Sequence, residues 1–250
     1  MASVNTNYGA MVALQQLNST NSQLEMTQSR INTGLKVSSA KDNGAIYAIA
    51  QGMRSDVAGF GVVSESLDRA SSTTDVAIAA GEAISDLLID MKEKALGAAD
   101  ASLTSSQRSA FNEDFTALRD QIATIVSNAE FNGVNLINNS TAGIDALANA
   151  DGTSTLTVAD EDLRLTGSIL TITAGTTINT VTTASATVAA IETSLNNLNQ
   201  SLARLGTASK ALTIHSDFVT KLSDVTEKGI GNLVDADLAK ESAKLQALQT

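Results

Sequence analysis

The strongest evidence for the fold lies in residues 4–35, VNTNYGAMVALQQLNSTNSQLEMTQSRINTGL. Its apolar residues recur at alternating steps of four and three, and they are Ala10, Leu14, Leu17, Leu24, Ile31 and Leu35, with Asn21 and Gln28 as polar interruptions. This spacing predicts one long helix with a single apolar seam, as in a coiled coil.

The remainder of this segment is almost uncharged. The first 29 residues contain no lysine or arginine, and Glu25 is the only charge before Arg30. A helix on a protein surface normally carries charged residues on its wet face. The segment therefore either packs against other helices on all sides, as in an assembly, or docks onto its own domain.

Composition limits the classes of protein to which the chain can belong. Of its 250 residues, 43% are hydrophobic and 3% aromatic, and neither proline nor cysteine occurs. The lack of proline favours long unbroken helices, and the lack of cysteine excludes disulfides and thiol chemistry. A net charge of −11 disfavours nucleic acid as a partner, and no apolar run is long enough to cross a bilayer. No cleaved signal peptide is recognisable, so we expect a cytosolic protein or one exported by another route.

Apolar periodicity predicts two more helices in the N-terminal half. One covers residues 45–99. Glycine is unfavourable inside a helix, so its glycines either allow close helix packing or mark breaks in the helix; they are Gly52, Gly59, Gly61 and Gly81. The other begins after a capping residue, Thr104, and ends near Ala129, just before the turn signal Asn132–Gly133.

Residues 137–185 have a different character. They are rich in Thr, Ser, Ala and Gly, and two short alternating stretches, 156–158 and 170–172, predict strands. Apolar periodicity stops near Ile137 and resumes near Val188, so we expect few core contacts with the helices and a fold that tolerates deletion of this segment. The prediction is a small, exposed, β-containing insertion, with a disordered linker as the alternative.

Helical periodicity returns at about Ser185 and continues to the end of the chain. Gly229 and Gly231 are expected to interrupt it, and a last amphipathic segment follows, capped by Asp235 and Asp237. A chain with helices at both ends most simply folds back on itself. The predicted fold class is mainly α, a long antiparallel helical rod or coiled-coil bundle built from both chain ends, with a small β-containing insertion.

The sequence offers no catalytic constellation. His215 is the only histidine, and Asp217 would not face it on a helix, so a structural contact is its expected role. The stretch 229–231 lacks the third glycine of a dinucleotide-binding loop, and the acidic run 160–162 is expected to form a solvated turn. No catalytic residue, cofactor or metal site is predicted, and an enzyme is the least favoured class.

Four segments, taken in order, resemble the terminal regions of bacterial flagellin, the subunit of the flagellar filament. They are Asn5–Asn7 with Ala13–Leu14, the stretch TGLKVSSAKDNGAIYAIA at 33–50, Phe131–Gly133, and DADLAKE at 235–241. The resemblance covers residues 1–136 and 186–250. The short insertion and the Asn-Gly-Ala-Ile variant are similar to flagellins of α-proteobacteria.

The resemblance implies a structural subunit that polymerises into the filament for swimming motility. It also implies export through the flagellar type III route, with an export chaperone and a filament cap protein as partners besides other copies, and a final place in the bacterial flagellum. Neither nucleic acid nor membrane insertion is expected. The alternatives are a hook–filament junction protein and a surface-exposed adhesive or ligand-binding protein with its specificity in residues 137–185.

The resemblance divides the chain as well. Residues 1–36 and 232–250 would belong to the inner core of the filament, 37–136 and 186–231 to an outer-core rod, and 137–185 to a variable surface insertion. Members of the family continue into another apolar stretch, so the second inner-core part would be truncated here.

Two sets of site residues follow from the resemblance. The assembly interface would be formed by Leu14, Leu17, Leu24, Ile31, Leu238, Leu245 and Leu248. The region contacted by an animal surface receptor would include Asp90, Lys92, Glu93 and Lys94. Flagellins that the receptor senses carry an arginine at the position of Asp90, so we expect weak receptor activation.

Overall fold

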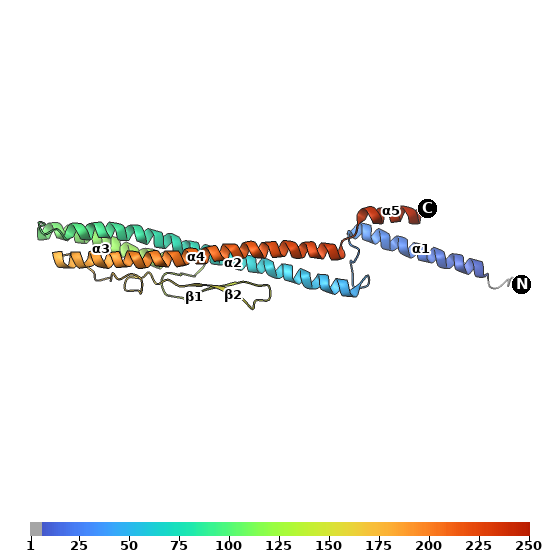
Figure 1. The fold of residues 1–250 in the computed structure, drawn as a ribbon, viewed down its shortest axis with the longest axis horizontal. Helices are drawn as coiled ribbons and strands as arrows, with labels where there is room; N and C mark the ends of the chain where they lie inside the picture. The colour runs from blue at the N-terminus through green and yellow to red at the C-terminus, as the bar shows by residue number, and fades with distance from the viewer. Residues whose placement is uncertain (1–6) are drawn as a thin grey trace. The chain divides into compact units, whose positions relative to one another are not determined.

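The computed structural model describes residues 7–250, which form five helices and one two-stranded sheet (Figure 1). The helices are α1 (Tyr8–Thr33), α2 (Gly44–Ala98), α3 (Ser105–Asn128), α4 (Val181–Val234) and α5 (Leu238–Gln249), and the strands are β1 (Gly143–Leu147) and β2 (Thr155–Ala159). The predicted mainly helical fold with a small β element is confirmed. The chain divides into two compact units, one made of residues up to Gly59 together with Lys221–Thr250 and the other of Phe60–Thr220.

The helix ends lie at residues whose side chains or backbones suit them to capping. Thr104 caps α3 through a capping box, in which its hydroxyl accepts from the Gln107 N–H while the Gln107 side chain accepts from the Thr104 N–H. Asp237 caps α5 by accepting from two backbone N–H groups of the first turn. α1 begins after the Asn7 cap and ends at Gly34, whose φ of 72° is the left-handed conformation that terminates many helices.

The long helices are not interrupted at their glycines, so the interruption predicted in the C-terminal helix is wrong. α2 and α4 run unbroken through Gly52, Gly59, Gly61, Gly81, Gly229 and Gly231. A Cβ at Gly81 would lie 2.7 Å from Leu202, and one at Gly229 would lie 2.8 Å from Met53. At these two positions close packing of neighbouring helices is therefore the reason for glycine.

In the unit Phe60–Thr220, α3 and long parts of α2 and α4 pack around one apolar core. Figure 1 shows α2 running antiparallel to both other helices. The core contains fully buried side chains from all three helices, among them Leu67, Ile84, Leu88, Phe115, Ile122, Ile191 and Leu198. Their three-, four- and seven-residue spacing places them on one face of each helix, as the periodicity predicted.

The strand predictions are right for one stretch and wrong for the other. β2 covers the predicted strand at 156–158 and pairs antiparallel with β1, from Gly143 opposite Ala159 to Leu147 opposite Thr155. The stretch 170–172 is not a strand, although two of its side chains are buried in the helical core.

The prediction that few core contacts link the segment between α3 and α4 to the helices is wrong. The segment buries many side chains in the same apolar cluster as the helices, among them Leu163, Leu170, Ile172 and Ile178. Arg119 of α3 donates to the Thr176 carbonyl at 3.0 Å, and Asn112 accepts from the Ile178 N–H at 2.8 Å. Because these apolar residues follow neither helical nor strand spacing over a long run, periodicity could not reveal their burial.

In the other unit, α1 packs against α5, and a small apolar cluster joins the start of α2 to the end of α4. The cluster is centred on Val37, Ala50 and Val234. The chain after α1 is hydrogen-bonded to the chain after α4: the Lys36 N–H donates to the Val234 carbonyl at 2.7 Å, and the Ala236 N–H donates to the Gly34 carbonyl at 2.8 Å.

Candidate assembly surface

α1 presents an apolar face that no other described part of the chain covers. Tyr8 is 80% exposed, Met11 61%, Leu14 59% and Leu17 56%. Single exposed apolar side chains are ordinary. These four follow one another at three-residue steps, a row that winds part of the way round α1, and such a concentration of large ones indicates a surface that binds another protein. This row lies on the helix that the sequence analysis singled out for its lack of charge.

The seven residues predicted for the interface fall into two groups. Four are half-buried in the single chain: Leu24, Ile31, Leu245 and Leu248. Three are exposed: Leu14, Leu17 and Leu238. Because α1 packs against α5, the chain partly covers this seam itself, and the part of α1 nearer its start is left open.

An ion pair between Arg30 and Glu241 holds α1 on α5. Arg30 Nη1 donates to Glu241 Oε1 at 3.1 Å, and the Glu241 side chain is only 12% exposed. Arg30 lies in the last turn of α1, where a cation interacts favourably with the helix dipole. Glu241 Oε2 and Thr27 Oγ1 are both buried without a hydrogen-bond partner among residues 7–250. The contact therefore depends on one ion pair and on its apolar side chains.

His215 has the structural contact expected of it. Its Nε2 lies 2.7 Å from the Ala148 carbonyl, immediately after β1, and the neighbouring Leu147 N–H donates to the Ser66 hydroxyl of α2. These two contacts fix the hairpin to α4 and α2.

Within residues 7–250, no group of three or more His, Cys, Asp or Glu side chains is placed to hold a metal ion. None of the helices described combines the length and apolarity needed to cross a membrane.

The acidic run 160–162 is not the solvated turn that the sequence predicted. Glu161 is buried, and its two carboxylate oxygens each accept from Arg204 of α4 at 2.6 Å. Asp162 accepts three hydrogen bonds from Arg164, two from its guanidinium and one from its backbone N–H, and these hydrogen bonds lower the pKa of Asp162. Asp160 has one buried oxygen without a partner among the residues described, and burial, together with the charge of Asp162, raises the pKa of Asp160 to about 6. The run anchors this segment to the helices.

The residues predicted for receptor contact lie on α2 in two different settings. Lys92 is paired with Glu192 of α4 at 2.9 Å, and Lys94 is paired with Asp114 of α3 at 3.4 Å. Asp90 and Glu93 are exposed and have no ion pair within the described residues. The exposed side of this stretch is therefore acidic, because its lysines are engaged by the neighbouring helices.

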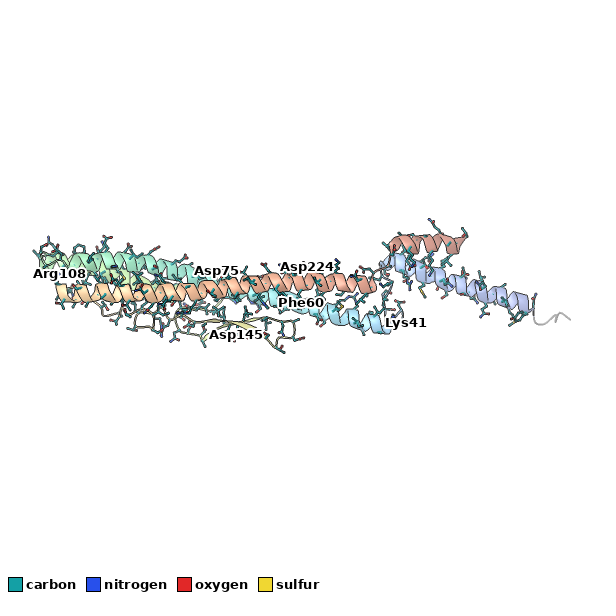
Figure 2. All side chains as sticks on the ribbon, in the orientation of Figure 1. Lys41, Phe60, Asp75, Arg108, Asp145 and Asp224 are labelled. Carbon is teal, nitrogen blue, oxygen red and sulfur yellow. The ribbon has the colours of Figure 1, made fainter. Side chains whose placement is uncertain are left out.

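Sequence reasoning missed a buried arginine that joins α2 to α3. Arg108 donates from Nε to the Ala98 carbonyl and from Nη2 to the Asp100 carbonyl, both at 2.7 Å. Figure 2 shows it where the two helices meet. The sequence feature that could have revealed this contact is a cation in the first turn of a helix, where the helix dipole favours anions. Here the guanidinium satisfies carbonyls at the end of the preceding helix instead.

The fold and this surface indicate the class of protein: a mainly helical structural protein whose apolar terminal helix is open to a partner. Comparison with known proteins gives the family. Residues 4–142 match the bacterial flagellin N-terminal helical region, and residues 188–250 match the bacterial flagellin C-terminal helical region. The chain belongs to the bacterial flagellin family.

Relatives match over nearly their whole length. The chain is 51% identical over 248 residues to flagellin FljM of Caulobacter vibrioides, an alignment that covers 99% of this chain and 90% of the relative. It is 35% identical over 261 residues to flagellin of Brucella melitensis, which covers 100% of this chain and 91% of that protein. The predicted α-proteobacterial type is confirmed.

Solved structures share the fold. A crystal structure of Bacillus cereus flagellin matches 60% of this chain and 86% of its own, with a TM-score of 0.53 and 23% identity. A putative flagellar hook-associated protein from Vibrio parahaemolyticus matches 78% of this chain and 100% of its own, with a TM-score of 0.65 and 14% identity. At these identities the likeness concerns the fold alone. By its family, the chain is a structural subunit of the flagellar filament and not an enzyme.

Proposed function

We propose that this subunit docks onto neighbouring copies in the filament through the open face of α1, with α5 completing the contact. The observation that supports the proposal is the row Tyr8, Met11, Leu14 and Leu17, each more than half exposed in the single chain. Apolar surface removed from water contributes about 25 cal/mol per Å² to association. The proposed interface consists of Leu14, Leu17, Leu24, Ile31, Leu238, Leu245 and Leu248.

Charge supports the choice of this face over the others. Every copy carries a net charge of −11, so copies repel one another at low ionic strength. α1 contains one acid, Glu25, and one base, Arg30, and the base is already paired with Glu241. A contact made by α1 therefore buries apolar surface without bringing further like charges together.

The proposal assigns roles to the remaining segments. Residues 1–36 and 232–250 form the inner contacts, and 37–136 and 186–231 form an outer rod; residues 1–6 lie outside the part that the structure describes. Of the segment 137–185, the exposed side chains of the β1–β2 hairpin form the variable outer surface. Its buried side chains belong to the rod.

The proposal also includes secretion of the subunit, with an export chaperone and a filament cap protein as partners. Supporting features are the absence of proline and cysteine, which suits a chain that is passed unfolded through a narrow channel, and the family to which the chain belongs. Neither nucleic acid nor a membrane is included among the partners, and the net negative charge supports the first exclusion.

Seeded polymerisation tests the docking face. Wild-type protein is expected to extend filament fragments, as measured by sedimentation and electron microscopy. The double variant Leu14→Glu, Leu17→Glu is expected to stay soluble, because each carboxylate would have to be buried in an apolar contact. The double variant Gln16→Glu, Gln23→Glu is the matched control, since it adds the same two charges at exposed polar positions of α1. Polymerisation of the double variant at the wild-type rate would contradict the proposal.

A further inference from the structure

The chain contains two Asn–Gly pairs, Asn43–Gly44 and Asn132–Gly133, and the structure places them in opposite settings. We infer that Asn132 is a site of spontaneous deamidation and isoaspartate formation in the folded protein, whereas Asn43 is protected by the helix that it caps. The inference is independent of the proposed assembly face.

The reaction needs only hydroxide and water. The deprotonated Gly133 nitrogen attacks the side-chain carbonyl carbon of Asn132, a C–N bond forms, and the bond to the side-chain nitrogen breaks with release of ammonia. Water then opens the resulting five-membered imide at one of its two carbonyls. One opening yields aspartate, and the other yields isoaspartate, in which the main chain runs through the former side chain. A glycine follows the asparagine, so no Cβ hinders the attacking nitrogen.

Asn132 and Gly133 are the two central residues of a tight turn. Phe131 and Val134 flank it and exchange backbone hydrogen bonds of 2.9 and 3.0 Å. The φ values are 51° at Asn132 and 81° at Gly133, and an asparagine in this region is strained relative to glycine.

Nothing in the described chain restrains the reacting groups of this turn. The Asn132 side chain is exposed, and neither its amide nor the Gly133 N–H has a hydrogen-bond partner within residues 7–250. A Cβ built on Gly133 would meet no atom within 4 Å, so the space beside the attacking nitrogen is open. A local change in the backbone of the turn is therefore sufficient for the Gly133 nitrogen to attack the side-chain carbonyl of Asn132.

Asn43 is held at both of its oxygens. Its side-chain oxygen accepts from the Ile46 N–H at 3.2 Å, and its carbonyl accepts from the Tyr47 N–H at 2.9 Å. Gly44 is the first residue of α2, so attack by its nitrogen requires release of the cap and unwinding of the first turn. The loop before the cap is fixed as well, because Asp42 accepts from the backbone N–H groups of Ser38 and Ser39.

The products would change the turn in two ways. A new carboxylate at position 132 would face a cavity of about 230 Å³ that Arg69 and Asp145 also line. Isoaspartate would add a backbone atom to a two-residue turn and break the pairing of Phe131 with Val134. The reaction requires no enzyme, so the modified fraction would increase with the age of the protein.

Peptide mapping by mass spectrometry tests the inference on the intact chain at mildly alkaline pH. The peptide containing Asn132 is expected to gain the mass of an amide-to-acid exchange and to become a substrate for isoaspartyl methyltransferase. The peptide containing Asn43 is expected to convert at least about fivefold more slowly, the factor that corresponds to a typical asparagine cap. In guanidinium, where the fold is lost, the two rates should converge.

Three results would overturn the inference. They are equal rates in the folded chain, faster conversion at Asn43, and no conversion at Asn132 under conditions where the unfolded chain converts. The variant Asn132→Asp supplies the standard for the aspartate product, so that the isoaspartate peptide is identified separately. Asp42→Ala removes the acceptor of the Ser38 and Ser39 N–H groups, which loosens the loop before α2 and should accelerate conversion at Asn43 while leaving Asn132 unchanged.

Discussion

Arg204 on α4 and Glu161 just after β2 form a two-pronged ion pair, with both N–O distances at 2.6 Å. The Glu161 side chain is only 7% exposed, whereas that of Arg204 is 57% exposed. The pair joins the segment between α3 and α4 to α4 itself, through a carboxylate that is buried. The segment between α3 and α4 is thus an integral part of its unit.

Removal of the cation should destabilise this unit. In Arg204→Met the buried Glu161 carboxylate loses two charge-assisted hydrogen bonds. We therefore expect the free energy of unfolding to fall by about 1–3 kcal/mol. The loss is smaller than for a fully buried ion pair because the Arg204 side chain is half exposed. Urea unfolding followed by circular dichroism measures it. Arg69→Met is the control, because its pair with Glu65 is 4.0 Å long and exposed, so a loss within about 0.5 kcal/mol is expected. Equal losses in the two variants would contradict the assignment.

Deletion of residues 141–183 should abolish cooperative unfolding of the unit Phe60–Thr220, contrary to the expectation from periodicity alone. The deletion removes completely buried side chains and leaves apolar surfaces of α2, α3 and α4 uncovered. Leu170→Ala alone should cost about 2–5 kcal/mol, whereas Thr155→Ala at an exposed position should stay within about 0.5 kcal/mol. A sharp, wild-type-like melting transition in the deletion variant would show that the segment is dispensable.

Asp160 should make stability depend on pH between about 4 and 6. Its pKa is raised from 3.8 to about 6 by burial and by the nearby Asp162 charge, so the folded state binds the proton more tightly than the unfolded state. The stabilisation from protonation is complete below the unfolded pKa and is lost as pH rises through the folded pKa. Asp160→Asn should therefore be more stable than wild type by about 1 kcal/mol at neutral pH, discounted for partial solvent exposure, and equal to it near pH 4. The measurement is urea unfolding of both proteins across this range, and a difference that does not change with pH would argue against it.

Hydrogen exchange should report the missing partners of α1. In dilute monomer we expect fast exchange over residues 8–30, because a helix with a largely exposed apolar face lacks the tertiary burial that stabilises most helices. In filaments the same amides should be protected. Amides around Leu88 in the apolar core provide the slow reference in both states. Strong protection of residues 8–30 in the monomer would show that α1 is stable without neighbours.

Asp90 should weaken recognition by the animal surface receptor that senses many flagellins. Its carboxylate is exposed on α2, and Lys92 and Lys94 are engaged in ion pairs within the bundle. From the resemblance, we expect flagellins that the receptor senses to carry an arginine at this position. An acid cannot supply the forked donors of a guanidinium, and it reverses the charge. A reporter-cell assay with monomer should give little or no activation. Activation equal to that of an enteric flagellin would disprove this. Asp90→Arg alone is not expected to restore activation fully, because Lys92 and Lys94 also shape that face of α2.

The helical framework could be predicted from the sequence alone, because its signals are local. The repeat of Leu14, Leu17 and Leu24, the Thr104 and Asp237 caps and the Asn132–Gly133 turn are each decided within a few residues. The same local nature explains the errors at Gly229 and Gly231, since a helix tolerates glycine where a neighbour such as Met53 leaves no room for a side chain.

Which surfaces of the helices are covered depends on tertiary packing. Burial of Leu170 and Ile172 against the helices and the Arg204–Glu161 ion pair join residues far apart in the chain. The two Asn–Gly pairs read alike in sequence and differ in backbone conformation and in hydrogen-bond partners. The same holds for the seam of α1, where α5 packs against the helix and Leu14 and Leu17 remain exposed. Periodicity identifies an apolar face, but whether water, the same chain or another copy lies against it is settled by long-range packing, which periodicity does not encode.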